Sequence, residues 1–431
     1  MKKDENTLII KTSIKNKNKI IETIKNKESN QTEYVYLEND KIKKINNYKV
    51  GDTEYIPPRF NSKLVQGRIL ILPSEVDTTE NEDLVKEISD FIRKYVDIQE
   101  DEIIVASYYI LMTWIYDKFH EIPYLRVLAD YGSGKTRFLR VIGELCYKAI
   151  FAGGGTTLSP IFRMMDQIEG TLVYDEADFR VSDKTSDFVK VLNNGYSNGG
   201  NLWRSEGDGI YDVKFFNIFG PKVLANRETY RDQALESRFL VIRIQRTKRE
   251  DIPRQLNGGF FMDAEKLRNK LLYWRLKNYN NEINLSLHRI SGVQPRLDQI
   301  ASPIIYIMTL MKDFASIPKF SEFIKRYDKE LLSNRSDCVE ADIIKTLQYF
   351  SKTGVYRVTI GDIRKHLLST GTFDDKYITA RKVGAIIKQK LHLQSERTTD
   401  GFVIDLIKNK KDVASLIERY GVSEHNEHNE R

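Results

Sequence analysis

Residues 124–136 read YLRVLADYGSGKT, and this stretch predicts the fold of the central part of the chain. Its apolar beginning, residues 124–129, has the length of a buried strand. A glycine-rich turn follows, and apolar residues then recur at helical spacing over residues 138–145. A strand, a glycine-rich turn and a helix in this order predict a phosphate-binding loop. The glycines let successive backbone N–H groups point at one anion, and the helix N-terminus adds its positive dipole end.

The residues of this turn are of the types that hold a nucleotide. The expected binding residues are Gly132, Ser133, Gly134, Lys135 and Thr136. Lys135 would reach the β- and γ-phosphates, and the Thr136 hydroxyl would ligate Mg²⁺. The usual pattern has glycine where this chain has Ala129, which fits there if its backbone keeps a negative φ. The alternative is a glycine-rich turn without a function.

A second motif, TLVYDE at residues 171–176, places two adjacent carboxylates at the end of an apolar strand. Acidic groups at such a place are costly unless a cation lies beside them. We expect Asp175 to hold the Mg²⁺ ion and Glu176 to polarise the attacking water as a general base. The alternative, which the motif alone would favour, is a solvated acidic turn.

Two later residues extend this pattern. Asn226 follows another expected strand, and a polar residue there would orient the attacking water. Arg238 lies immediately before the last expected strand, where it would sit at a subunit edge and point at the γ-phosphate of a neighbour. In GTPases such an arginine raises kcat by a factor of roughly 10³–10⁵. Arg231 is the competing candidate, and the alternative for Arg238 is a surface ion pair with Glu236 or Glu228.

Apolar runs alternate with helical stretches through the middle of the chain, which predicts an α/β unit with a parallel sheet. The expected strands are residues 124–129, 149–152, 170–174, 222–225 and 239–244. Helices are expected at 81–97, 101–119, 263–277 and 296–314. Residues 337–420 predict three helices and a hairpin, the order of a winged-helix domain. For residues 1–60 we expect short strands at 34–37 and 41–50, the first 30 residues being either a disordered basic arm or a small module.

Composition narrows the class of protein. The 431 residues carry a net charge of +7, which permits nucleic acid as a partner without requiring it. The two cysteines, Cys146 and Cys338, are far apart in sequence, which excludes a disulfide scaffold. Neither has a neighbouring cysteine or histidine of the kind that indicates a zinc site. The N-terminus has no apolar run of signal-peptide length, and the longest apolar stretch, residues 103–116, is too short to span a membrane. We therefore expect a cytoplasmic protein with no membrane partner.

The order of these motifs resembles that of the AAA+ ATPases over roughly residues 86–330. Within that family, a hairpin expected from residues 201–206 and 210–216 resembles the pre-sensor-1 β-hairpin of the minichromosome-maintenance (MCM) and superfamily 3 helicases. Ser237-Arg238-Phe239 is similar to the MCM arginine-finger motif, and Arg296 stands where MCM proteins carry a sensor-2 arginine. The alternative for Arg296 is a surface arginine at a helix start.

The resemblance implies a fold with three parts. These are an N-terminal basic module (residues 1–85), an AAA+ P-loop core with a helical lid (86–330) and a winged-helix domain with a polar tail (331–431). The core would hold a parallel five-stranded sheet between helices. On the hairpin, Arg204, Lys214 and Trp203 would contact DNA, unless the hairpin only packs on the sheet. In the winged helix, the cations expected to contact DNA are Arg381, Lys382, Lys388 and Arg397, unless they form an ordinary solvated face.

The resemblance also implies a function. We expect an ATP- and Mg²⁺-dependent replication helicase of the kind found on plasmids, phages and mobile elements. It would form a homo-oligomeric, hexameric ring on single-stranded and origin DNA, with other replication proteins as further partners. An ATP-switched replication initiator that binds DNA without unwinding it is the alternative. A remodeller acting on protein is a third interpretation, which the absence of an aromatic-glycine pore loop disfavours.

Overall fold

The structure is a computed structural model of the chain. It describes residues 7–16, 19–79, 83–175, 183–205, 213–230, 232–336, 338–371, 373, 375, 378–399 and 401–422. Met1–Lys325 form one compact unit and Arg326–Arg431 a second. Among the described residues, no helix is both long enough and apolar enough to cross a membrane.

The first unit is built on a five-stranded parallel sheet, which confirms the fold class predicted from the apolar runs. In chain order its strands are β8 (Tyr124–Leu128), β9 (Ile150–Ala152), β10 (Leu172–Tyr174), β13 (Lys222–Asn226) and β14 (Phe239–Arg243). Their spatial order is β14-β8-β13-β10-β9, and every neighbouring pair is parallel. Because the strands share one direction, the carboxyl ends of β8, β13 and β10 meet at the same edge, where α/β proteins bind their ligands.

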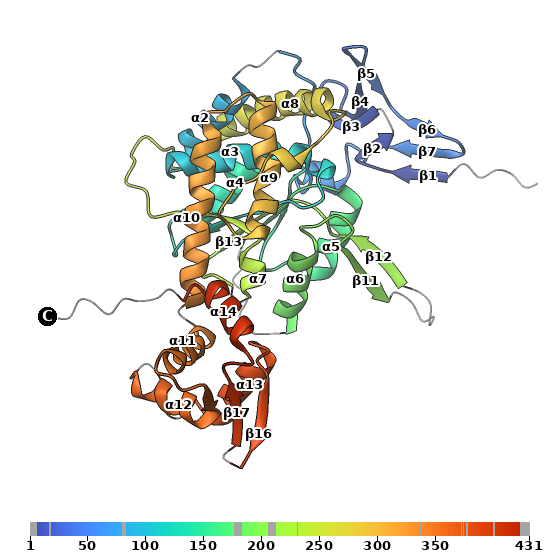
Figure 1. The fold of residues 1–431 in the computed structure, drawn as a ribbon. Helices are drawn as coiled ribbons and strands as arrows, with labels where there is room; N and C mark the ends of the chain where they lie inside the picture. The colour runs from blue at the N-terminus through green and yellow to red at the C-terminus, as the bar shows by residue number, and fades with distance from the viewer. Residues whose placement is uncertain are drawn as a thin grey trace, which may run out of the picture. The chain divides into compact units, whose positions relative to one another are not determined.

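Helices flank this sheet (Figure 1). They are α2 (Leu84–Tyr95), α3 (Glu100–Trp114), α4 (Lys135–Leu145), α5 (Leu158–Ile168), α6 (Asp183–Asn194), α7 (Gln233–Glu236), α8 (Gly258–Asn278) and α9 (Pro295–Leu310), with short 3₁₀ turns η1 (Tyr116–Lys118) and η2 (Leu285–Leu287). Helix α10 (Ser316–Ser336) begins in the first unit and ends in the second. Helix α4 packs on β8, β13 and β10. Burial by the helices explains why the strands read as nearly continuous apolar runs. A separate hairpin of β11 (Asn201–Ser205) and β12 (Val213–Asn217) packs on α5.

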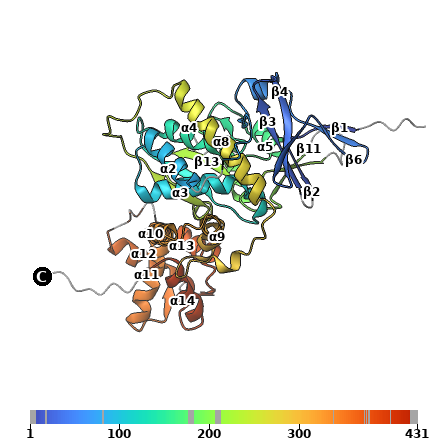
Figure 2. The same cartoon turned by 90° about the horizontal axis from the view of Figure 1, so that it is seen from above.

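The N-terminal residues form two small sheets. Strands β2 (Ser13–Asn16), β3 (Lys19–Asn26), β4 (Gln31–Glu38) and β5 (Lys41–Ile45) make an antiparallel meander. Strands β1 (Thr7–Ile10), β6 (Tyr48–Val50) and β7 (Thr53–Ile56) make the other sheet, and the short helix α1 (Lys63–Gln66) follows. Both views show these strands together at one side of the first unit (Figures 1 and 2). The single strand expected at 41–50 is thus two strands in different sheets, and β1 to β3 occupy the segment whose structure the sequence left open.

Buried charges fasten these N-terminal strands to the rest of the unit. Glu22 of β3 is 1% exposed, and its carboxylate lies 3.0 Å from Lys148 Nζ and 2.8 Å from Arg275 Nε. The Tyr147 hydroxyl also donates to it at 2.8 Å. Arg275, in α8, forms a second, bidentate pair with Asp117 at 3.0 Å. The N-terminal strands are therefore an integral part of the unit that holds the parallel sheet.

The second unit contains a small antiparallel sheet and four further helices. Its elements after α10 are α11 (Val339–Lys352), β15 (Arg357–Thr359), α12 (Ile360–Ser369), α13 (Ala380–Gln389), β16 (Ser395–Thr398), β17 (Gly401–Asp405) and α14 (Lys410–Arg419). The sheet order is β15-β17-β16. Thr359 starts α12 with a capping box, accepting from the Asp362 N–H while the Asp362 carboxylate accepts from the Thr359 N–H. The three predicted helices and the hairpin are present, and the structure adds β15 and α14.

Candidate functional site

The glycine-rich turn between β8 and α4 has the backbone that an anion-binding loop requires. Gly132 has a φ of +74° and Gly134 a φ of +100°, values that residues other than glycine rarely adopt. Gly134 is also the N-cap of α4, so the helix begins directly at the loop. Ala129, where the usual pattern has glycine, keeps a negative φ. The substitution therefore leaves the loop without strain at this position.

The two polar side chains at the start of α4 already have partners within the site. The Thr136 hydroxyl donates to Asp175 Oδ2 at 2.7 Å. Lys135 Nζ donates to the carbonyl oxygens of Ala129 and Asp130, the latter at 3.2 Å. Asp175 directly follows β10, so its carboxylate comes from a second loop at the same edge of the sheet. The structure thus brings together the phosphate-loop and acidic motifs that the sequence predicted as one site.

Asn226 occupies the position between these two motifs. It ends β13, which lies between β8 and β10, and its carbonyl oxygen accepts from the Ala129 N–H at 3.2 Å. Its carboxamide exchanges hydrogen bonds with the Tyr230 hydroxyl at 3.1 and 3.3 Å. Asn226 is therefore at the edge where the sequence predicted it, held by a partner that the sequence did not indicate. The expected general base, Glu176, lies outside the described residues.

Arg238 and Arg296 meet at the opposite edge of the sheet. Arg238 precedes the amino end of β14, and a strand of five residues places that end roughly 17 Å from the edge that carries the phosphate loop. The Arg238 guanidinium donates to the Ala234 carbonyl oxygen and lies 4.5 Å from the Tyr196 ring. Arg296 contacts the same carbonyl oxygen at 3.4 Å and lies 5.7 Å from the same ring. The two guanidinium groups are therefore neighbours.

The surroundings of Arg238 differ from the exposed subunit edge expected for it. Arg238 is only 7% exposed, and its Nε has no hydrogen-bond partner among the described residues. Burial lowers the pKa of Arg238, and the charge of Arg296 lowers it further. The surface pair with Glu236 does not form, because Glu236 is buried and paired with Arg126. The competing candidate, Arg231, lies outside the described residues.

Sequence reasoning missed Arg126 and Tyr230, and it named Glu236 only as a possible partner of Arg238. Arg126 lies in the middle of β8 with no exposed surface, and its two terminal nitrogens donate to the Glu236 carboxylate. Tyr230 donates its backbone N–H to the same carboxylate. The signal for this cluster was present in the sequence, because an arginine inside an apolar strand must find a buried partner.

The hairpin carries the residues expected to contact DNA on both of its faces. Arg204 faces α6, where its guanidinium lies 3.1 Å from Asp187, and Lys214 lies opposite Arg204 in the register. Trp203 and Phe215 pair across the strands on the other face, with ring centroids 5.1 Å apart. They are 66% and 59% exposed. The described part of the hairpin therefore offers solvent an aromatic pair that includes the predicted Trp203, and the predicted Lys214 is exposed as well. Its expected tip lies outside the described residues.

The cations predicted in the second unit lie on its surface. Arg381, Lys382 and Lys388 are on α13, and Arg397 is on β16. Arg381, Lys388 and Arg397 are exposed, and Lys382 is partly so. Thr379 is the N-cap of α13, and its hydroxyl accepts from the Lys382 N–H. The structure thus presents the third helix and the hairpin as a surface with several accessible cations.

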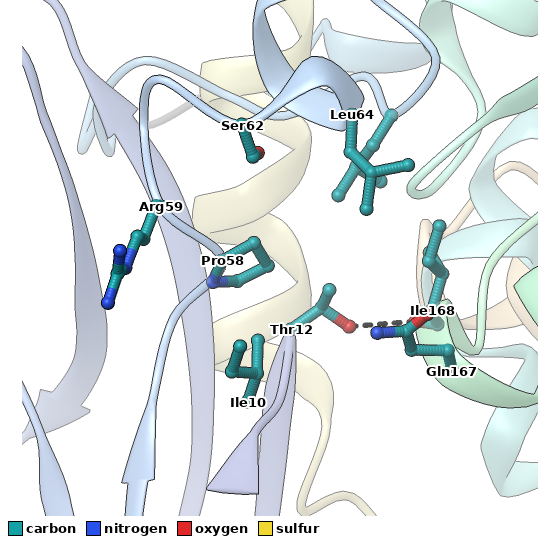
Figure 3. Close-up of a pocket in the computed structure, with 9 residues that line it drawn as sticks. Ile10, Thr12, Pro58, Arg59, Ser62, Leu64, Gln167 and Ile168 are labelled. Carbon is teal, nitrogen blue, oxygen red and sulfur yellow. Dashed lines mark hydrogen bonds between the residues drawn. The ribbon is translucent and has the colours of Figure 1, made fainter.

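A separate cavity of about 160 Å³ lies where the N-terminal strands meet the end of α5 (Figure 3). Its walls are mostly apolar and include Ile10, Pro58, Leu64 and Ile168. The Thr12 hydroxyl beside it donates to the Ile168 carbonyl oxygen at 2.8 Å. None of the site residues predicted from the sequence lines this cavity, so it is distinct from the phosphate loop.

Comparisons with known proteins identify structural likenesses only. No family model matches the chain, and no curated protein matches it. Two solved structures of the apo A form of the NrS-1 C-terminal region are similar, with TM-scores of 0.38 and sequence identities of 10% and 9%. Each match covers 89% of this chain and 96% of the other.

Proposed function

We propose that this protein is an ATP hydrolase of the AAA+ type. The observation that carries the proposal is the 2.7 Å contact between the Thr136 hydroxyl and the Asp175 carboxylate. These residues are 39 positions apart and follow different strands, so they come into contact only because the chain folds in this way. Mg²⁺-dependent phosphoryl transfer uses a hydroxyl and a carboxylate as oxygen ligands of the metal ion. It also uses a glycine-rich loop at a helix N-terminus to bind the phosphates.

The residues at this edge have separate roles in the proposed reaction. Thr136 and Asp175 would hold the Mg²⁺ ion, which when bound would neutralise charge on the β- and γ-phosphates. Lys135 would exchange the loop carbonyl oxygens for phosphate oxygens. Glu176, next in the chain after Asp175, would accept a proton from the attacking water. Asn226 would orient that water with its carboxamide.

The remaining two arginines would act on a neighbouring subunit. Arg238 and Arg296 lie at the far edge of the sheet from their own phosphate loop, so they can reach a γ-phosphate only in a second copy of the chain. Their mutual repulsion, which contributes to the lowered pKa of Arg238, would be relieved by an anion placed between subunits. The sheet order, with the Asn226 strand between the two motif strands, also fits the AAA+ resemblance.

For the task driven by this hydrolysis, we propose replication: a hexameric ring helicase that moves on single-stranded DNA. The aromatic pair Trp203 and Phe215 on the hairpin suits base stacking, and the order of elements in the second unit fits a winged helix. An ATP-switched initiator that binds DNA without unwinding it is the second candidate. The ion pair between Arg204 and Asp187 favours it, because a paired cation is less able to track phosphates.

The test of the proposed function is steady-state ATP turnover by the full chain, with and without single-stranded DNA, at two salt concentrations. We expect turnover that DNA stimulates at low salt and stimulates much less at high salt, because phosphate contacts release counterions. Lys135→Ala should abolish turnover, and Lys325→Ala, remote from the loop in sequence, is the control. If single-stranded DNA does not change the turnover, the protein is an ATPase but the helicase proposal is excluded. If no turnover is measured, both proposals are excluded.

A further inference from the structure

The two edges of the sheet are joined by a largely buried chain of hydrogen bonds. It begins at Asn226, whose carboxamide exchanges hydrogen bonds with the Tyr230 hydroxyl at 3.1 and 3.3 Å. The Tyr230 backbone N–H donates to Glu236, the last residue of α7. Glu236 in turn accepts from Arg126, at 2.6 Å through Nη1. An unmade hydrogen bond is costly in such surroundings, so displacing one member disturbs the next.

Arg126 anchors this chain in the centre of the sheet. It pairs in register with Leu224 of β13 and Val241 of β14, and it has no exposed surface. Its guanidinium lies 4.6 Å from the Phe239 ring and 5.3 Å from the Tyr230 ring. A buried cation with such surroundings is fixed in place by its carboxylate partner. Arg126 is therefore the fixed end of the chain, and a change at Tyr230 reaches α7 through the Glu236 carboxylate that both groups share.

Helix α7 connects this chain of hydrogen bonds to the far edge. Arg238 follows Glu236 by two residues, and its backbone N–H donates to the Leu235 carbonyl oxygen of α7 at 3.0 Å. The Ala234 carbonyl oxygen, also in α7, accepts from the guanidinium groups of both Arg238 and Arg296. A shift of this four-residue helix therefore moves Arg238 and changes the contact that Arg296 makes with it.

We propose that Tyr230 is a positioning residue that couples the Asn226 carboxamide to α7 and so to Arg238. When Asn226 turns toward a bound nucleotide, the Tyr230 hydroxyl loses this partner, and the Glu236 contact transmits the change to α7. The nucleotide state of one subunit thereby sets how its Arg238 meets the next subunit. This inference rests on the proposed ATPase function and adds a route for communication within each subunit.

Tyr230→Phe in the full chain tests the first link, since it removes only the hydroxyl and keeps the ring against Arg126 and Phe239. We expect kcat for ATP to fall about two- to tenfold, the effect of removing one hydrogen bond, with KM changed less. Tyr109→Phe is the matched control. The buried Tyr109 hydroxyl donates to the Lys222 carbonyl oxygen at 2.9 Å, at the other end of β13, so kcat should stay unchanged. An unchanged kcat in Tyr230→Phe would overturn the inference.

Mixed oligomers test the second link. Subunits with Lys135→Ala have no turnover of their own but still offer Arg238 to wild-type neighbours. Adding Tyr230→Phe to these subunits should lower the turnover of the mixture further, toward the level set by Lys135→Ala/Arg238→Ala subunits. Equal dilution curves with and without Tyr230→Phe would show that the hydroxyl acts only at its own nucleotide, and would overturn the coupling. Absence of turnover in the wild-type chain would overturn the proposed function itself, and this inference with it.

Discussion

At the scale of single residues, buried guanidinium groups determine which distant segments are held together. Arg126 and Arg275 have no exposed surface, and each has a carboxylate that accepts from two of its nitrogens. Such a group is tolerated only when a carboxylate and further hydrogen bonds replace its water. Removing the carboxylate therefore costs far more than breaking an exposed ion pair.

The Asp117 and Arg275 pair predicts how stability depends on pH. Burial alone would raise the pKa of Asp117, but the charges of Arg275 and Lys15 outweigh it and hold this pKa below its usual 3.8. The folded-state pKa is therefore lower than the unfolded one, so the pair stabilises the protein above pH 3.8 and loses this effect as the pH falls further. Asp117→Asn should lower the free energy of unfolding at pH 7 by about 3 kcal/mol and flatten its decline in acid. Urea titrations at pH 7, 5 and 3.5 measure both effects.

The control for this prediction is Asp90→Asn. Asp90 pairs with Arg93 at 2.7 Å, but its side chain is 51% exposed, so the substitution should change stability little. An Asp117→Asn variant with the wild-type acid slope would contradict the assignment of the pH dependence to Asp117.

At the scale of elements, the hairpin makes a spectroscopic prediction. The chain has three tryptophans, and Trp203 is 66% exposed while Trp114 and Trp274 are 1% and 8% exposed. Stacking of a DNA base on Trp203 should therefore quench the exposed part of the emission. Trp203→Ala should weaken binding of an oligo(dT) strand by about 5- to 150-fold, the effect of losing ~1–3 kcal/mol of stacking. Trp203→Phe should keep most of the affinity and lose the quenching. Quenching that persists in Trp203→Phe would exclude this site.

The exposed cations on α13 and β16 of the second unit predict that the affinity for duplex DNA depends on salt. Changing Arg381, Lys388 and Arg397 together to glutamate should weaken binding of duplex DNA. It should also reduce the slope of log affinity against log salt by about 0.9 for each phosphate that the protein no longer neutralises. ATP turnover without DNA should stay at the wild-type level. The matched control changes three exposed cations of α14 to glutamate: Lys410, Lys411 and Arg419. An equal decrease in both variants would indicate a general charge effect in place of a defined surface.

Periodicity predicted where these elements lie better than which way their side chains face. The hairpin strands appear close to the expected ranges because alternating residues around a Gly-Asp-Gly turn are a strong local signal. The face was ambiguous because Leu202 and Trp203 are adjacent and both apolar. Packing decides it: Leu202 lies with Phe162 and Phe216 in a buried cluster, which turns Trp203 outward and Arg204 toward Asp187.

At the scale of the whole molecule, the parallel sheet was predictable and the attachment of the N-terminal strands was not. The five strands are local apolar runs, so each is visible in its own sequence. The N-terminal attachment depends on Glu22, Lys148 and Arg275, which are more than 100 residues apart along the chain. Nothing local to any of them indicates its partners. The meeting of the glycine-rich turn, Asp175 and Asn226 at one edge was predictable for the same reason as the sheet, since each follows the end of a strand.

The proposed site residues lie on opposite edges of the sheet, and this predicts that two copies of the chain must assemble for turnover. A strand of five residues separates Arg238 from its own phosphate loop by roughly 17 Å, so in the proposed reaction one chain alone would not complete the site. Arg238→Ala subunits keep an intact loop, and Lys135→Ala subunits keep an intact arginine. Each variant alone should bind DNA and show little turnover, whereas their mixture should regain part of the wild-type rate, because some interfaces combine a wild-type loop with a wild-type arginine. Turnover assays across mixing ratios, with oligomer size measured by light scattering, check this. A mixture no more active than its components would place Arg238 in a structural role within its own subunit, held as it is against Tyr196.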